Sequence, residues 1–482
     1  MISMALMACM AINAVEYTGP IVVKMGNITR TADVTVTVIE QENGLYELDL
    51  DAPIVGLMKM YDVPAATAGD ITTYSALRNV STSLGEMVTN LFARTVDGMM
   101  TADVTIPARG ITMFFNTVGN HFQLPNSDLE NWDSSYDNEP ARWHGFKSAT
   151  GMWAWAAPAS LASSEDIHAG ATGQYSAVIT AKSAFGTIAN GTMTSGRLNA
   201  GATSATSTSN NASTAESNGN DFYMPLAAKP DQFKVWLKYQ QGTDNANNKA
   251  NVSVKTFNGT YYQEPCDKEY TNLSGSIEGG QIAACDWTQF TFPFDYRSYS
   301  SNHAITKGIF VTFSTNANPG QGSENDKLFI DDMELVYLAD MVDIRYQNNI
   351  ITGWDPAVTT YNMEIAGEPN LDDFNYDYDG ESAVCTKSME PNADGSYRIA
   401  ISVVSADLQN ATCYIINVTP ASEVMLGDVD GNGIINVSDA TLLITYVLNG
   451  NADINRPNSD MDDNGIINVS DITLLINYLL TH

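Results

Sequence analysis

Two stretches near the C-terminus decide the fold of the last part of this chain: Asp428–Leu448 (DVDGNGIINVSDATLLITYVL) and Asp460–Leu480 (DMDDNGIINVSDITLLINYLL). They are offset by 32 residues and are identical at 16 of 21 positions. A repeat this dense indicates a duplicated structural unit. Each copy opens with the pattern Asp-x-Asp-x-Asn-Gly, which places oxygen ligands at alternate positions of a tight loop.

The spacing of these oxygen ligands predicts one Ca2+ site in each copy. Loop positions 1, 3, 5, 7 and 12 are Asp428, Asp430, Asn432, Ile434 (through its carbonyl) and Asp439 in the first copy, and Asp460, Asp462, Asn464, Ile466 and Asp471 in the second. Gly433 and Gly465, at position 6, allow the backbone to reverse. Hard oxygen ligands in this number favour Ca2+ over Mg2+, which prefers to keep its waters.

An apolar helix is expected after each loop, since Leu443 and Val447, like Leu475 and Leu479, recur at i and i+4. Ser438 and Ser470 are the expected N-caps. No helix is expected before either loop, so each copy is half of an EF-hand. Residues 428–480 contain eight Asp and one Arg, so we expect this region to need Ca2+ in order to fold.

The duplicated loop and helix resemble a type I dockerin, an all-α domain of two half EF-hands, over residues 425–482. The resemblance implies Ca2+-dependent binding to a cohesin-bearing protein. In that family loop positions 10 and 11 contact the cohesin, and here they are Val437-Ser438 and Val469-Ser470. Identical pairs imply a near two-fold surface that docks in two orientations. Val-Ser stands where the best-known examples have Ser-Thr, which leaves the class of partner open. The alternative is a Ca2+-stabilised cap without a partner.

Composition sets the class of the whole chain. With 482 residues it is expected to hold several domains. A net charge of −33 argues against nucleic acid and anionic membranes as partners. No apolar run reaches about 18 residues, which excludes a transmembrane helix. Low charge content with abundant Ser, Thr, Asn and Gly is typical of β-rich secreted proteins.

The N-terminus favours export. Residues 1–14 (MISMALMACMAINA) fit a signal peptide cleaved after Ala14, although a basic n-region is missing, so we expect the true start to lie upstream of Met1. A buried first strand and a lipoprotein anchored through Cys9 are the alternatives. The protein is therefore expected to be secreted or at the cell surface. Cys266/Cys285 and Cys385/Cys413 form two local pairs, either as disulfides or as free thiols.

Residues 16–118 predict a small antiparallel β-barrel. Asp33–Ile39 alternates polar and apolar residues, and Asn43-Gly44 is a hairpin signal. The pattern resembles the calycin-like domain of secreted bacterial proteins, with a filled core expected in preference to a ligand cavity. Residues 340–421 resemble the immunoglobulin-like or cadherin-like sandwiches that serve as spacers in such proteins.

Residues 119–339 predict a β-sandwich. Asn126–Trp132 (NSDLENW) and Phe329–Leu335 (FIDDMEL) resemble the first and last strands of jelly-roll carbohydrate-binding modules, and the whole stretch resembles a carbohydrate metabolism domain of gut bacterial surface proteins. The resemblance implies a structural Ca2+ held by Glu130 and Asp331, which are otherwise solvated acids at a strand edge. Ser195–Asn220, rich in Ser, Thr, Asn and Ala, is expected to be a flexible insertion.

Tryptophans provide the candidate carbohydrate-binding residues, because a sugar ring packs its C–H face on indole. Trp153 and Trp155 are two residues apart and would share a face of a strand. Together with Trp143 they are the expected platform, although core positions are the alternative. Trp236 and Trp287 are expected in the core.

The sequence contains no GxSxG, P-loop, GxGxxG or HExxH motif. Its reading is therefore a mainly β, non-catalytic, secreted protein that associates with polysaccharide and attaches through a dockerin. The alternative is a glycoside hydrolase or related enzyme on the same dockerin, since a pair of carboxylates suffices for that reaction. A third reading is an adhesin or spacer.

Overall fold

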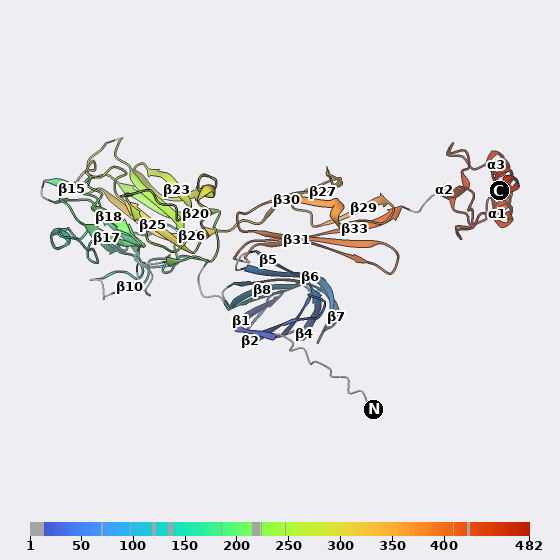
Figure 1. Cartoon of the computed structure of the whole chain (residues 1–482), viewed down its shortest axis with the longest axis horizontal. Helices are drawn as coiled ribbons and strands as arrows, with labels where there is room; N and C mark the ends of the chain where they lie inside the picture. Colours follow the sequence, from blue (N-terminus) through green and yellow to red (C-terminus); the bar gives the residue numbers. More distant parts are fainter. Residues whose placement is uncertain are drawn as a thin grey trace, which may run out of the picture.

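The computed structural model describes residues 14–482 apart from 69–70, 97, 118–121, 134–137, 185, 215–221, 223, 246, 408 and 422–424. The signal-peptide expectation, Cys9 included, falls on residues 1–13, which lie outside the described residues. The chain is mainly β with helices at its C-terminal end (Figure 1), which confirms the predicted class. None of the helices in the described part is both long and apolar enough to cross a membrane.

The N-terminal unit is one nine-stranded antiparallel sheet that nearly closes into a barrel, in the order β4-β3-β2-β1-β9-β8-β7-β6-β5. Its interior is filled by apolar side chains from alternating positions, such as Ile21, Val23 and Phe115. The strands are β1 (Ala14–Met25), β2 (Ile28–Glu40), β3 (Tyr46–Ala52), β4 (Gly56–Val63), β5 (Ala65–Ala68), β6 (Ile71–Thr82), β7 (Gly85–Val96), β8 (Met99–Ile106) and β9 (Ile111–Asn116).

The central unit packs two sheets around a common apolar core that includes Trp143, Phe233 and Phe313. One sheet has the order β12-β13-β26-β20-β24 and the other β16-β25-β21-β23, with β19 also paired to β25. Their strands are β12 (Leu161–Ser164), β13 (Ser176–Thr180), β16 (Thr192–Thr194), β19 (Met224–Pro225), β20 (Gln232–Gln240), β21 (Ala250–Phe257), β23 (Leu273–Ile282), β24 (Cys285–Pro293), β25 (Gly308–Ser314) and β26 (Lys327–Val336). The opening segment lies along β26, because the Gln123 amide bonds both the N–H and the carbonyl of Leu335.

Smaller elements surround this core. They are the hairpin β14 (Lys182–Ala184) and β15 (Thr187–Ala189), the pair β10 (Trp132–Asp133) and β11 (Glu139–Pro140), and the sheet β17 (Arg197–Ala200), β18 (Asn210–Ser213) and β22 (Gln263–Glu264). The expectation of a flexible loop over Ser195–Asn220 is therefore wrong for its first part. Strand pairing of β17 with β18, and of β18 with β22, orders a segment whose composition is that of a loop.

The third β unit has a sheet β28-β27-β30 and a sheet β29-β33-β32-β31 around its own apolar core. The strands are β27 (Asp340–Tyr346), β28 (Asn349–Ile350), β29 (Thr360–Ala366), β30 (Phe374–Asp379), β31 (Val384–Pro391), β32 (Tyr397–Val404) and β33 (Ala411–Ala421). Cys385 on β31 and Cys413 on β33 lie on either side of β32. All four cysteines of the described part are free thiols, which is the second of the two alternatives left open by the sequence.

The N-terminal unit packs on this third unit, although the central unit separates them in sequence (Figure 1). The buried Arg94 donates from Nη1 to the carbonyl of Ala406 at 2.6 Å, and Arg78 pairs with Glu390 at 2.7 Å. Burial lowers the pKa of Arg94 to about 10. Phe92 and Val404 form an apolar contact across the same interface.

The tail contains α1 (Val437–Asn449), α2 (Arg456–Ser459) and α3 (Val469–Thr481), with Leu443 of α1 and Leu475 of α3 in a shared core. Two local expectations are wrong. The N-caps are Asn436 and Asn468, because their side chains accept from the backbone and Asp439 and Asp471 complete capping boxes. A single helical turn, α2, also precedes the second loop.

Candidate functional site

The first tail loop gathers three carboxylates at one point. Ligand oxygens of Asp428, Asp430 and Asp439 lie within 4.8 Å of one another. Asp439, fully buried, accepts from the N–H of Asn436 at 2.8 Å and from the N–H of Asp430 at 3.1 Å. Asp428 accepts from the N–H groups of Asn432 and Gly433, both at 3.0 Å. Asp430 accepts from the Asn432 N–H at 3.1 Å, so backbone amides hold all three carboxylates.

The second loop repeats this geometry. Oxygens of Asp460, Asp462 and Asp471 also lie within 4.8 Å of one another. The fully buried Asp471 accepts from Met461 N–H at 2.7 Å and from Asn468 N–H at 2.8 Å. Asp460 accepts from Gly465 N–H at 2.7 Å. The duplicated sequence thus gives a duplicated donor set.

Both donor sets fit a hard divalent cation. Three carboxylates forced together repel each other, and a buried carboxylate without a countercharge costs several kcal/mol. The position-5 side chains Asn432 and Asn464 and the carbonyls of Ile434 and Ile466 belong to the same loops, and Asn436 and Asn468 donate to those carbonyls at 3.2 and 3.0 Å. Oxygen-only sets of this kind are typical of Ca2+ sites.

A paired surface lies at the start of the two helices. Val437 and Val469 are 72% and 65% exposed, and Ser438 and Ser470 are exposed beside them. The same pair is exposed at the same position of both copies, so the two helix starts present matching surfaces. These are the four residues that the sequence assigns to cohesin binding.

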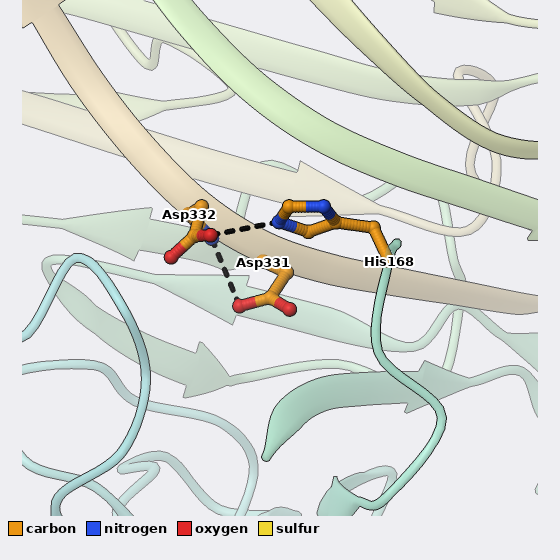
Figure 2. Close-up of side chains that lie close together, drawn as sticks. All are labelled: His168, Asp331 and Asp332. Atoms are coloured by element: carbon orange, nitrogen blue, oxygen red, sulfur yellow. Dashed lines mark hydrogen bonds and ion pairs between the residues drawn. The ribbon is translucent and has the colours of Figure 1, made fainter. Parts of the chain in front are cut away.

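A third cluster lies in the central unit, and of its three members the sequence predicts only Asp331 as a ligand. His168, from the loop after β12, approaches Asp331 and Asp332 of β26, with ligand atoms within 4.8 Å of one another. Figure 2 shows the His168 Nε2 to Asp332 Oδ2 contact, which is 2.7 Å, and the Asp332 N–H donating to Asp331 at 2.9 Å. The imidazole also stacks on Trp236, with centroids 4.2 Å apart. No local spacing signals a site whose members are 164 residues apart.

Asp331 is the unusual member of this cluster. It is 2% exposed, and among the described residues its Oδ2 has no hydrogen-bond partner. Burial, followed by the charge of Asp332, raises the pKa of Asp331 to about 7, and the charge of Glu130 adds to this. Glu130 itself accepts from the N–H groups of Gln174 and Tyr175, at 2.9 and 2.7 Å. Glu130 is therefore near Asp331 but outside the group that converges within 4.8 Å.

The tryptophans separate into three classes. Trp143 is fully buried in the central core, and its indole N–H donates to the Pro125 carbonyl at 3.2 Å. It therefore cannot contact a carbohydrate ligand. Trp155 is 80% exposed and Trp153 is half-buried, with ring centroids 6.5 Å apart at 31°. They lie at a 3-10 turn, Ala154–Ala156, and not on the expected strand. Trp236 and Trp287, expected in the core, are half-buried around His168.

A cavity of about 270 Å³ opens beside Trp153. Its walls come from the hairpin β14–β15, from β16 and β25, and from the small sheet β17-β18-β22. Trp153 is fixed to this wall, since its N–H donates to the Ala200 carbonyl at 2.9 Å. The cavity is slightly smaller than the usual range of small-molecule sites, about 300–1,000 Å³.

Comparison with known proteins supports the tail assignment. Residues 426–480 match the model of the dockerin type I domain. Dockerins of this type bind Ca2+ and imply a cohesin partner, and dockerin-bearing proteins are typically extracellular or cell-surface components. No curated protein matches the chain. A solved structure, "Structure of PNGF-II in P21 space group", is 7% identical over 68% of this chain and 70% of that chain. Its TM-score of 0.14 is too low to indicate a shared fold.

Proposed function

We propose that this chain is a non-catalytic, secreted or cell-surface protein that associates with polysaccharide and attaches to a cohesin-bearing partner through its C-terminal dockerin. The observation that carries the proposal is the pair of buried carboxylate sets in the tail, each followed by a helix with an exposed Val-Ser pair. The β units then serve as cargo that the tail positions.

Calcium would act by making the docking surface. Asp439 and Asp471 are shared between the loops and the first turns of α1 and α3, where they complete the capping boxes. A cation held by these carboxylates ties each loop to the start of its helix. The order of Val437 and Val469 therefore depends on the ion, and partner binding should depend on it too.

The repeated Val-Ser pair supports two docking orientations. One orientation uses α1 as the main contact, and a half-turn of the tail puts α3 in the same place. Neither helix contains Lys, Arg or Glu. The surface that we expect on the cohesin is accordingly apolar and hydroxyl-rich.

The carbohydrate association rests on Trp153, Trp155 and the adjacent cavity. An exposed indole next to a half-buried one gives an apolar aromatic surface for sugar rings, although the two rings are tilted by 31°. Among the described residues lining the cavity, one carboxylate is present, that of Glu264. Glycoside hydrolysis needs two carboxylates flanking the bond, so the lining favours binding over catalysis.

The central cluster is proposed as an additional cation site. Asp331, Asp332 and His168 can supply ligands at once, and the unpartnered Oδ2 of Asp331 supplies a free acceptor. Such an ion would join the loop after β12 to β26. Glu130, the other residue expected to be a ligand, would contribute its negative charge near Asp331.

One experiment with the full chain tests both halves of the proposal. Binding to a panel of immobilised cohesins is measured in millimolar Ca2+ and in chelator, alongside retention in gels containing polysaccharides. We expect Ca2+-dependent capture by a cohesin that Val437→Arg with Val469→Arg abolishes, and retention by a glycan that Trp153→Ala weakens. Release of soluble sugar from polysaccharide by pure protein would instead favour the enzyme alternative.

A further inference from the structure

We infer that the cavity beside Trp153 binds an uncharged sugar unit and discriminates against anionic sugars. The inference rests on the proposed carbohydrate association and adds the class of ligand. It comes from three features of the cavity: its single charge, the existing partners of that charge, and the small side chains of its walls.

The one charged residue that lines the described cavity is Glu264, and its carboxylate already accepts hydrogen bonds from the protein. Glu264 accepts from Ser253 Oγ at 3.0 and 2.9 Å and from Tyr262 Oη at 3.2 Å. The nearest cation to it, the buried Lys255, is 3.6 Å away and also pairs with Glu278 at 2.9 Å. Lys255 thus pairs with two glutamates, so the group of three carries a net negative charge and does not attract an anionic ligand.

An anionic sugar would lose water here without gaining a countercharge. The described lining residues include no Lys, Arg or His. A uronate or sulfate would therefore be partly desolvated beside the Glu264 carboxylate, and like charges in such a place disfavour binding. The net charge of −33 adds repulsion at longer range.

A neutral sugar matches the remaining surface. Ala189, Ala200 and Pro158 line the cavity together with the half-buried Trp153, and these apolar side chains can pack against C–H groups. Hydroxyl and amide groups of Thr192, Asn211 and Thr312 line the same space. Such groups both donate and accept, which is what sugar hydroxyls require.

The walls are held in place before any ligand arrives. The Thr150 N–H donates to the Leu198 carbonyl at 2.9 Å, and the Ala200 N–H donates to the Thr150 carbonyl at 2.7 Å. Together with the Trp153 contact, these bonds fix β17 against the segment that carries the indole. A cavity that is already formed pays little ordering cost on binding.

The test uses the full chain and two forms of each ligand, one neutral and one anionic, that share the same backbone. Neutral polysaccharides are compared with the same polymers after oxidation of their primary hydroxyls to carboxylates, and polygalacturonate is added as a naturally acidic polymer. Affinity is measured by gel retention and, for oligosaccharides, by calorimetry. The blocking variant is Ala189→Phe, which fills the cavity and removes no hydrogen bond. The matched control is Ala162→Phe on the exposed face of β12.

We expect a neutral glycan to bind, its oxidised form to bind at least about tenfold more weakly, and Ala189→Phe to lose binding while Ala162→Phe keeps it. Preference for the acidic form, or neutral binding that Ala189→Phe leaves unchanged, overturns this inference but leaves the carbohydrate association standing. Binding of no glycan at all removes both.

Discussion

The two kinds of carboxylate cluster in this molecule differ in how the chain builds them. In the tail, every proposed ligand of a site comes from twelve consecutive residues, and backbone amides of the same loop orient the carboxylates. In the central unit, His168 and Asp332 meet across 164 residues only after β12 and β26 have entered one sheet. A local site can be recognised from sequence, and we expect its fold to depend on the ion. A site assembled from distant segments cannot be recognised in this way, and the fold must form before its ligands meet.

The largest effect is expected in the tail. Chelation should remove hydrogen-exchange protection from α1 and α3 in the full chain, because each set of three carboxylates then repels without a cation. A thousandfold excess of Ca2+ over Kd corresponds to about 4 kcal/mol. Peptides from β2 of the N-terminal unit are the internal control, since no proposed cation ligand lies in that strand. Equal protection of the tail in Ca2+ and in chelator would contradict the metal assignment.

In the central cluster, loss of the Asp331 carboxylate should increase the free energy of unfolding when no cation is bound. The pKa of Asp331, about 7 in the fold against 3.8, means that the folded state binds this proton more tightly than the unfolded chain. Stability in chelator is therefore fully present below pH 4 and is lost as pH rises towards 7, by at most about 4 kcal/mol. In chelator at pH 8, Asp331→Asn should be more stable than the parent.

Calcium should reverse that order, because the variant loses a ligand. Denaturation followed by Trp fluorescence reports the central unit, where six of the seven Trp residues lie. If Ca2+ leaves the ranking of the two proteins unchanged, no cation is held at Asp331.

A half-buried carboxyl outside the described clusters gives the reference case. Burial raises the pKa of Asp103 to about 6, and this residue lies between Phe92 and Phe114 in the sheet register. Stability from its proton is present below pH 4 and is lost as pH rises through 6, by at most about 3 kcal/mol. Asp103→Asn should flatten this pH dependence in hydrogen exchange of β7–β9. Unlike Asp331→Asn, it should be indifferent to Ca2+.

The smallest effect should come from a single change on the duplicated surface. With two equivalent orientations available, Val437→Arg removes one of them and weakens cohesin binding by about twofold, or 0.4 kcal/mol. The same holds for Val469→Arg, and only the double variant should abolish binding. Calorimetry in Ca2+ distinguishes this from a one-sided surface, on which one of the single variants would already be inactive.

The accuracy of the sequence predictions follows the same division. The loops, the two long helices and the mainly β class are set by local spacing and alternation, and they were predicted. The capping residues were misplaced by two positions, because Asn436 and Ser438 are both good caps and only geometry separates them. Trp143 and Trp153 are alike in sequence, and whether each is buried depends on strands far away in the chain. For the same reason the ordered β17 and β18 were read as a loop.

The contact between Arg94 and the Ala406 carbonyl has a practical consequence for dissecting the protein. Residue 118 is the domain boundary that the sequence predicts. Cutting the chain there would remove the N-terminal unit from the surface of the third unit and expose the apolar side chains of Val384 and Val404 to solvent. Fragments cut there should aggregate, and this aggregation would not bear on the proposed sugar binding and docking of the intact molecule.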